Sequence, residues 1–189
     1  MDKQRIFNAI IVDTNAFDGK GNDFCGYHSK LLPSFFDTIR RLNIQLISHP
    51  ILKEETIKHI KTGDWKNKPE NAITAITKYK RYLEIAGVSY DAIIEKLKDI
   101  DLCKNTIDAF QKEISSALML SYSDPEKVFK KYFSNEPPFS ESGAKKSEFP
   151  DAFVIEAIKQ YLIDNPTISV LIVAKDKDWK NAFEDNKNI

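Results

Sequence analysis

Acidic residues stand at the ends of the apolar segments of this chain. Asp13 directly follows the first apolar run, and Asp176 follows the last one. Asp151 precedes that last run by one helix-length segment, and Glu54 and Glu55 come shortly after the second apolar run. If the runs are parallel strands, their carboxyl ends share one edge of a sheet, where ligands bind. We therefore expect sequence-distant carboxylates to converge on one small site.

Clustered carboxylates favour one kind of chemistry. Without a counter-ion they repel one another and raise one another's pKa. Mg²⁺ and Mn²⁺ prefer oxygen ligands, so either ion would relieve this repulsion. Such ions polarise phosphates and lower the pKa of bound water. The acids therefore predict a metal-dependent hydrolase acting on phosphodiester bonds.

Each acid taken singly also has a structural explanation. Asp151 near a helix N-terminus is favoured by the helix dipole, and Asp176 and Asp178 are also explained as turn residues after a strand. The two glutamates fit an exposed helical face. Asp13 is the hardest to explain in this way, because it follows a fully apolar strand. It is the combination of acids that favours a site.

The elements that position these acids follow from the apolar patterns. Short β-branched runs predict strands over 6–12, 44–48 and 168–174, buried on both faces. Helical spacing of apolar residues predicts helices over 31–42 and 51–60. Alternating strands and helices are typical of an α/β fold with a parallel sheet.

The middle of the chain departs from this alternation. Four segments show helical spacing: 72–86, 93–97, 107–118 and 128–133. No strand is expected between them, so we interpret residues 62–135 as a helical insertion within a single domain spanning 1–189. Residues 135–147 have the composition of a loop, and Pro150 marks the expected start of the next helix.

Composition excludes several classes of protein. The 189 residues suffice for one domain with a sizeable core. With 28 basic and 28 acidic residues the net charge is zero, which excludes a strongly basic chain but not a local basic face. Two cysteines without paired spacing support neither a disulfide framework nor a cysteine zinc site. The first apolar run is too short for a signal peptide or a membrane span, so we expect a cytoplasmic protein.

Four short motifs resemble those of a known family. The sequences IIVDTNAF at 10–17, ILKEE at 51–55, SEFPDAF at 147–153 and IVAKDKDW at 172–179 resemble, in order, the acidic motifs of PIN-domain nucleases. The EFPDA stretch is similar to a larger PIN-like branch in which a helical insertion is common. The resemblance implies a three-layer α/β/α sandwich that cleaves RNA, and in some members DNA, with Mg²⁺ or Mn²⁺.

The resemblance also assigns residues. It implies four catalytic and metal-binding acids: Asp13, Glu54, Asp151 and Asp176. Asn15 would brace the site, while Glu55 and Asp178 are alternative ligands. Glu54 is preferred to Glu55 because it follows Ile51 by three residues, as the family's acid follows its apolar position.

Three further features bear on the resemblance. Glu148 would orient a lysine or a bound water, although an acid at a helix start explains it equally simply. Ala174 stands where the family usually has a hydroxyl residue, two before the last acid. The chain also ends near where a closing strand would begin, so we expect it to be either a trimmed domain or the N-terminal part of a longer protein.

Lysines flank the two last motifs. Lys145 and Lys146 precede the third motif, and Lys175, Lys177 and Lys180 surround the fourth. They would hold phosphates on either side of the scissile bond, with an ordinary solvated surface as the alternative. Five aromatic residues offer stacking surfaces for bases, with core packing as the alternative: Trp65, Tyr79, Tyr82, Tyr132 and Phe139.

The expected function is that of a metal-dependent nuclease, with RNA preferred over DNA. We expect it to bind nucleic acid and not a membrane. A further partner would be either a second copy of the chain or a regulatory protein. The main alternative is a non-catalytic PIN-like module that binds nucleic acid or protein. A toxin–antitoxin ribonuclease is disfavoured by chain length, and an aspartate-nucleophile phosphatase by Asn15, where that class needs a second acid.

Overall fold

The computed structural model describes residues 7–17, 31–63, 67–139 and 145–184. The strands are β1 (Ala9–Val12), β2 (Gln45–Ser48), β3 (Leu118–Met119) and β4 (Val170–Val173). The helices are α1 (Thr14–Phe17), α2 (Leu31–Arg41), α3 (Pro50–Thr62), α4 (Lys68–Lys78), α5 (Lys80–Ile85), α6 (Asp91–Asp99), α7 (Leu102–Ile114), α8 (Pro125–Ser134), α9 (Lys145–Asp164) and α10 (Lys177–Ala182). None of the helices in these ranges is both long and apolar enough to cross a membrane.

The described strands form one parallel sheet in the order β3-β2-β1-β4. β1 lies inside the sheet, with Ala9 paired to Gln45 on one side and to Val170 on the other. All four carboxyl ends therefore point to the same edge, as the sequence predicts. The strands expected over 6–12, 44–48 and 168–174 are each present in shortened form.

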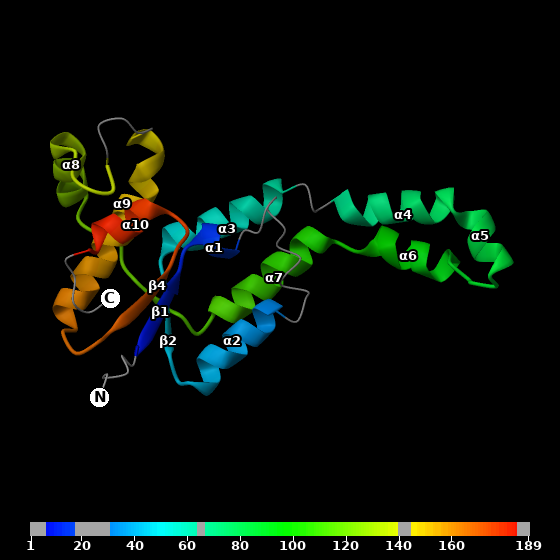
Figure 1. Cartoon of the computed structure of the whole chain (residues 1–189), viewed down its shortest axis with the longest axis horizontal. Helices are drawn as coiled ribbons and strands as arrows, with labels where there is room; N and C mark the ends of the chain where they lie inside the picture. The colour runs from blue at the N-terminus through cyan, green and yellow to red at the C-terminus, as the bar shows by residue number, and fades with distance from the viewer. Residues whose placement is uncertain (1–6, 18–30, 64–66, 140–144, 185–189) are drawn as a thin grey trace.

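Helices cover both faces of the sheet, which explains why β1 is apolar at every position (Figure 1). Ile11 packs in one core with Ile155 of α9 and Trp179 of α10. Ile10 packs on the opposite face with Phe36 of α2 and Phe110 of α7. Alternate residues of one strand thus enter two separate cores. This arrangement confirms the predicted three-layer α/β fold.

The middle of the chain contains a strand that the sequence analysis did not predict. β3 pairs with β2, with Leu118 opposite Ile47, and α7 packs against the sheet through Phe110 and Ile114. Part of the expected insertion over 62–135 therefore belongs to the sheet and its layers. A strand of two residues is too short to show the alternation by which strands are predicted.

Helix α9 also begins earlier than expected. It starts at Lys145, and Pro150 lies inside it. Proline fixes φ at a helical value and removes one hydrogen bond to the preceding turn, so a helix can continue through it at a cost in stability. Glu148 and Asp151 consequently lie on one helix, close to one turn apart.

Residues 68–99 form a helical arm that projects away from the sheet (Figure 1). Helices α4 and α6 run side by side, and α5 turns the chain between them. Gly87, with φ of 69°, allows the backbone to reverse after α5. Within the arm only Pro69 and Tyr90 are buried. The helix expected over 72–86 is divided at Tyr79 into α4 and α5.

The contrast between sheet and arm predicts different responses to truncation. Ile11 is fully buried, whereas Ile85 on the arm is 77% exposed. We expect Ile11→Ala to lower the free energy of unfolding by roughly 3–4 kcal/mol and Ile85→Ala to change it by less than about 0.5 kcal/mol. Urea denaturation of both variants measures this, and equal losses would contradict the separation of arm and core.

Candidate active site

Asp13 lies in the turn between β1 and α1, and its side chain is held in the interior. Its residue exposure is only 3%. Its backbone N–H donates to the Val173 carbonyl at 2.9 Å, and its carbonyl accepts from the Ala16 N–H at 3.0 Å. The carboxylate is therefore fixed between the ends of β1 and β4 by the regular backbone of both.

Other carboxylates from distant segments act on Asp13. Burial and then the charges of Asp151, Glu55 and Asp176 raise its pKa from 3.8 to about 7, while the Thr14 backbone N–H opposes the rise. These acids come from the ends of β1 and β4 and from α3 and α9. The charges that raise the pKa of Asp13 therefore come from elements that lie far apart along the chain.

Asp151 experiences the same crowding. Burial, followed by the charges of Glu55, Asp176 and Asp178, raises its pKa from 3.8 to about 6. The indole N–H of Trp179 offsets part of this rise, although it lies near Asp151 without the geometry of a hydrogen bond. The Trp179 ring itself is almost fully buried in the core beneath α9 and α10.

Of the two adjacent glutamates, Glu55 faces Asp13. Glu55 is half-buried and accepts a hydrogen bond from the Thr14 hydroxyl at 3.3 Å, whereas Glu54 is exposed. Leu52 lies on the buried face of α3. With about 100° per residue, Glu55 lies about 60° from Leu52 and Glu54 about 160° from it. This placement differs from the register expected from Ile51, and the spacing of Leu52, Thr56 and Ile60 was the signal that favoured Glu55.

Two threonines that the sequence analysis did not single out support this geometry. The Thr14 hydroxyl lies 3.3 Å from the Thr56 hydroxyl as well as from Glu55. Thr56 donates to the Leu52 carbonyl at 2.8 Å, which leaves its oxygen free to accept. Both threonines are buried. In the sequence, the only indication of this role was that Thr14 follows Asp13 and Thr56 follows Glu55.

Asn15 joins the carboxyl ends of β1 and β4. Its Oδ1 accepts the backbone N–H of Lys175 at 3.0 Å, so the β1–α1 turn is tied to the segment after β4. This contact fixes the backbone from which Lys175 and Asp176 project. The role of Asn15 in bracing an active site stays a prediction.

Asp176 and Asp178 lie at the start of α10. Asp176 is exposed and accepts the Asp178 N–H at 3.0 Å, capping the helix. Asp178 is half-buried, and burial with the charge of Asp176 raises its pKa. Lys175 and Lys177 are exposed on either side of Asp176. A shallow cavity of about 320 Å³ lies beside them, lined in part by Asp176 and Lys180.

Glu148 lies close to one turn before Asp151 on α9. Its Oε2 is buried and has no hydrogen-bond partner among the described residues. The position at i, i+3 places Glu148 and Asp151 on neighbouring parts of one helix face. The side chains of Lys145 and Lys146 lie outside the described residues, so their predicted phosphate contacts stay predictions.

The donor set has the chemistry of a site for a hard divalent cation. It consists of carboxylate oxygens whose pKa values are raised first by burial and then by the negative charge of neighbouring carboxylates. In the described ranges, however, no three His, Cys, Asp or Glu side chains already lie in an arrangement that could hold a metal ion. The residues therefore fit such an ion by donor type and charge. Their carboxylates, however, do not lie in the arrangement of a metal site.

Comparison with known proteins adds one match. A family model described as a PIN domain matches residues 10–179, nearly the whole chain and all four acidic segments. No curated protein and no solved structure matched.

The raised pKa of Asp13 predicts how stability depends on pH without divalent metal. Its folded pKa of about 7 exceeds 3.8, so the folded state binds the extra proton and stability falls as pH rises from about 4 to about 7. In EDTA we expect Asp13→Asn to raise the free energy of unfolding by roughly 2–4 kcal/mol at pH 8, and to change it by less than about 1 kcal/mol at pH 4.5.

Urea denaturation at the two pH values measures this difference. The matched control is Glu54→Gln, which removes an exposed carboxylate one residue from Glu55 and should have the same effect at both pH values. An Asp13→Asn protein less stable than the wild type at pH 8 would contradict the crowding of carboxylates around Asp13.

Proposed function

We propose that this chain, which belongs to the PIN-domain family, is a metal-dependent nuclease that hydrolyses phosphodiester bonds, with RNA preferred over DNA. Family membership supports a nuclease-type module in general. The observation that carries the finer proposal is the buried Asp13 carboxylate, whose pKa three other carboxylates raise. Such an arrangement costs folding free energy, which a bound divalent cation would offset.

The acids of the cluster would hold the ion: Asp13, Glu55, Asp151 and Asp176. When bound, Mg²⁺ or Mn²⁺ supplies Lewis acidity toward a phosphate oxygen and lowers the pKa of a bound water. Thr14 would keep the Glu55 carboxylate in place through its hydroxyl. Asn15 would hold the backbone of Lys175, so that Lys175 and Lys177 meet the phosphates beside the scissile bond.

A second candidate function is binding of nucleic acid without cleavage. It is favoured by the separation of the acids, because no described group of three already has the arrangement of a metal site. The two candidates differ in one requirement. In a nuclease, the bound substrate or ion must bring the carboxylates closer together than they lie in this structure. A module that only binds nucleic acid has no such requirement. Loss of charge at Asp13 would then abolish cleavage but leave binding by the lysines.

The test is cleavage of labelled single-stranded RNA and DNA in Mn²⁺, Mg²⁺ or EDTA. We expect cutting by the wild type with either metal, none in EDTA, and faster cutting of RNA. Asp13→Asn and Asp151→Asn should each lower the rate at least about 100-fold, because a lost ligand costs more than a lost supporting residue. Retained circular dichroism spectra would show that these variants fold.

Glu54 and Glu55 provide a matched pair for the same assay. We expect Glu55→Gln to lower the rate at least about tenfold and Glu54→Gln to leave it within about threefold, because Glu55 alone of the two faces Asp13. Wild-type rates in both Asp13→Asn and Asp151→Asn would refute the proposed site. RNA binding without cleavage in Mn²⁺ would favour the non-catalytic module.

A further inference from the structure

The outer end of the arm carries two exposed tyrosines. Tyr79 is 51% exposed and Tyr82 is 70% exposed, with their ring centroids 6.4 Å apart. By contrast Tyr132 and Phe139, the other described aromatics considered for stacking, pack together in a buried cluster on α8 and α9. Trp65 lies outside the described residues. Helical spacing ordinarily indicates that aromatic residues pack in a core. Tyr79 and Tyr82 are exposed instead.

Cations surround these rings. The sequence at 78–82 is Lys-Tyr-Lys-Arg-Tyr, with three basic residues and no acid. The Lys78 ammonium lies 5.4 Å from the centre of the Tyr79 ring, and Arg81 is exposed. Lys80 instead contacts Glu84 at 3.7 Å and the Tyr90 ring at 5.8 Å, inside the arm. Lys78 and Arg81 are thus the cations best placed to meet a ligand.

We propose that this arm tip, residues 78–82, is a second binding site for single-stranded nucleic acid. Bases stack on Tyr79 and Tyr82, and phosphates contact Lys78 and Arg81. Exposed aromatic faces beside cations are the combination by which proteins bind unpaired strands without reading their sequence. The proposal extends the proposed function to a longer substrate, but binding at the arm tip does not require cleavage.

The charge of the arm tip favours nucleic acid over a protein partner. Exposed Ile85 and Val88 follow the tip and would suit a protein contact by themselves. Tyrosine and arginine are common in protein interfaces, but lysine is depleted there, so the lysine beside the rings is the residue that favours nucleic acid. In a chain of zero net charge, Lys78 and Arg81 beside the two rings provide a local match for phosphate.

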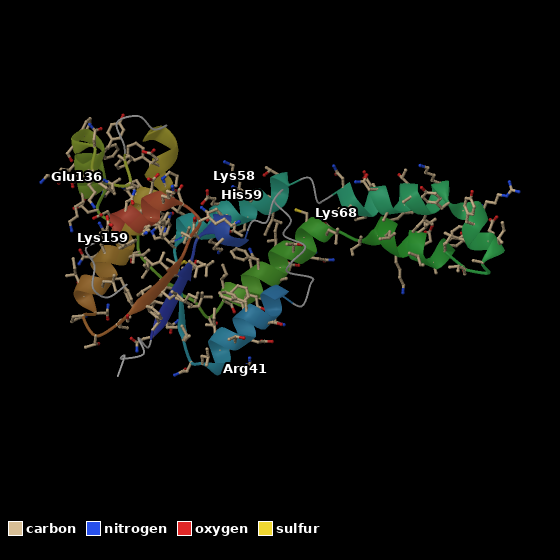
Figure 2. All side chains as sticks on the ribbon, in the orientation of Figure 1. Arg41, Lys58, His59, Lys68, Glu136 and Lys159 are labelled. Carbon is tan, nitrogen blue, oxygen red and sulfur yellow. The ribbon has the colours of Figure 1, made fainter. Side chains whose placement is uncertain are left out.

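The arm tip is well separated from the acidic cluster. Figure 1 shows α3 and α4 following each other in the same direction, toward the arm tip. The part of α3 from Glu55 to Thr62 and the 11 residues of α4 together rise about 28 Å at 1.5 Å per residue. Exposed Lys58 and Lys68 lie along this course (Figure 2). At about 3.4 Å per stacked nucleotide, a strand of at least roughly eight nucleotides is needed to span both places.

The first measurement is RNA binding in EDTA, by fluorescence anisotropy with a labelled 20-nucleotide strand. Loss of one stacked base corresponds to about tenfold, so we expect the Tyr79→Ala/Tyr82→Ala double variant to bind at least tenfold more weakly. Tyr82→Phe, which keeps a ring, should bind as the wild type does. Lys78→Ala/Arg81→Ala should lower the slope of log affinity against log salt by about 1.4.

The matched controls lie on α8, on the other side of the molecule from the arm (Figure 1). Phe133→Ala removes an aromatic ring that is 77% exposed, and Lys130→Ala removes an exposed cation. Both should bind the 20-nucleotide strand within about twofold of the wild type. Equal weakening by these variants and by the arm variants would overturn the proposal.

The second measurement separates the arm tip from the acidic cluster. With Mn²⁺, the double tyrosine variant should cut a 4-nucleotide strand as the wild type does, but show a raised KM for the 20-nucleotide strand. If the wild type cuts neither strand, the proposed function fails while the binding result in EDTA still decides the arm tip. Unchanged RNA binding, with dimers in sedimentation that the tyrosine variant loses, would refute the nucleic-acid site and indicate a contact between copies.

Discussion

The rest of this structure depends on keeping one carboxylate, that of Asp13, inside the molecule beside other carboxylates. Burial and like charges both oppose ionisation there, so the folded chain carries an electrostatic cost that its packing must exceed. The packing is correspondingly thorough: β1 is apolar at every position and enters a core on each face. A strand covered on one face only would present Asp13 to water, and the repulsion would largely disappear.

Three consecutive residues, Asp13 to Asn15, connect the buried carboxylate to other parts of the fold. Asp13 bonds through its backbone to β4, Thr14 reaches Glu55 on α3, and Asn15 holds the segment after β4. These partners lie between 41 and 160 positions away along the chain. One short turn therefore contacts segments that lie far apart along the chain. Substitutions in the turn should consequently affect several acids at once, whatever their own chemistry.

The strands, the sheet class and the position of Asp13 could be predicted because long apolar runs specify burial on both faces without further context. The choice between Glu54 and Glu55 depended on which of several apolar residues faces the core, and Ile51 was the less buried guide. β3 is too short to have a pattern, and Pro150 marks a helix boundary in most sequences but not in this one. The arm projects because its helices pack against each other and not against the sheet. The spacing of apolar residues within one helix does not indicate which other element the helix packs against.

The pairing of β1 with β4 has a consequence for synthesis on the ribosome. One edge of β1 stays unpaired until Val170, the partner of Ala9 on β4, has been synthesised. At roughly 5–20 residues per second, that interval lasts on the order of 8–30 seconds. Glu55 and Asp151 are synthesised during this interval, whereas Asp176 is synthesised only after Val170. Asp176 can therefore approach Asp13 only after β4 has been made, and a product truncated before β4 lacks that carboxylate.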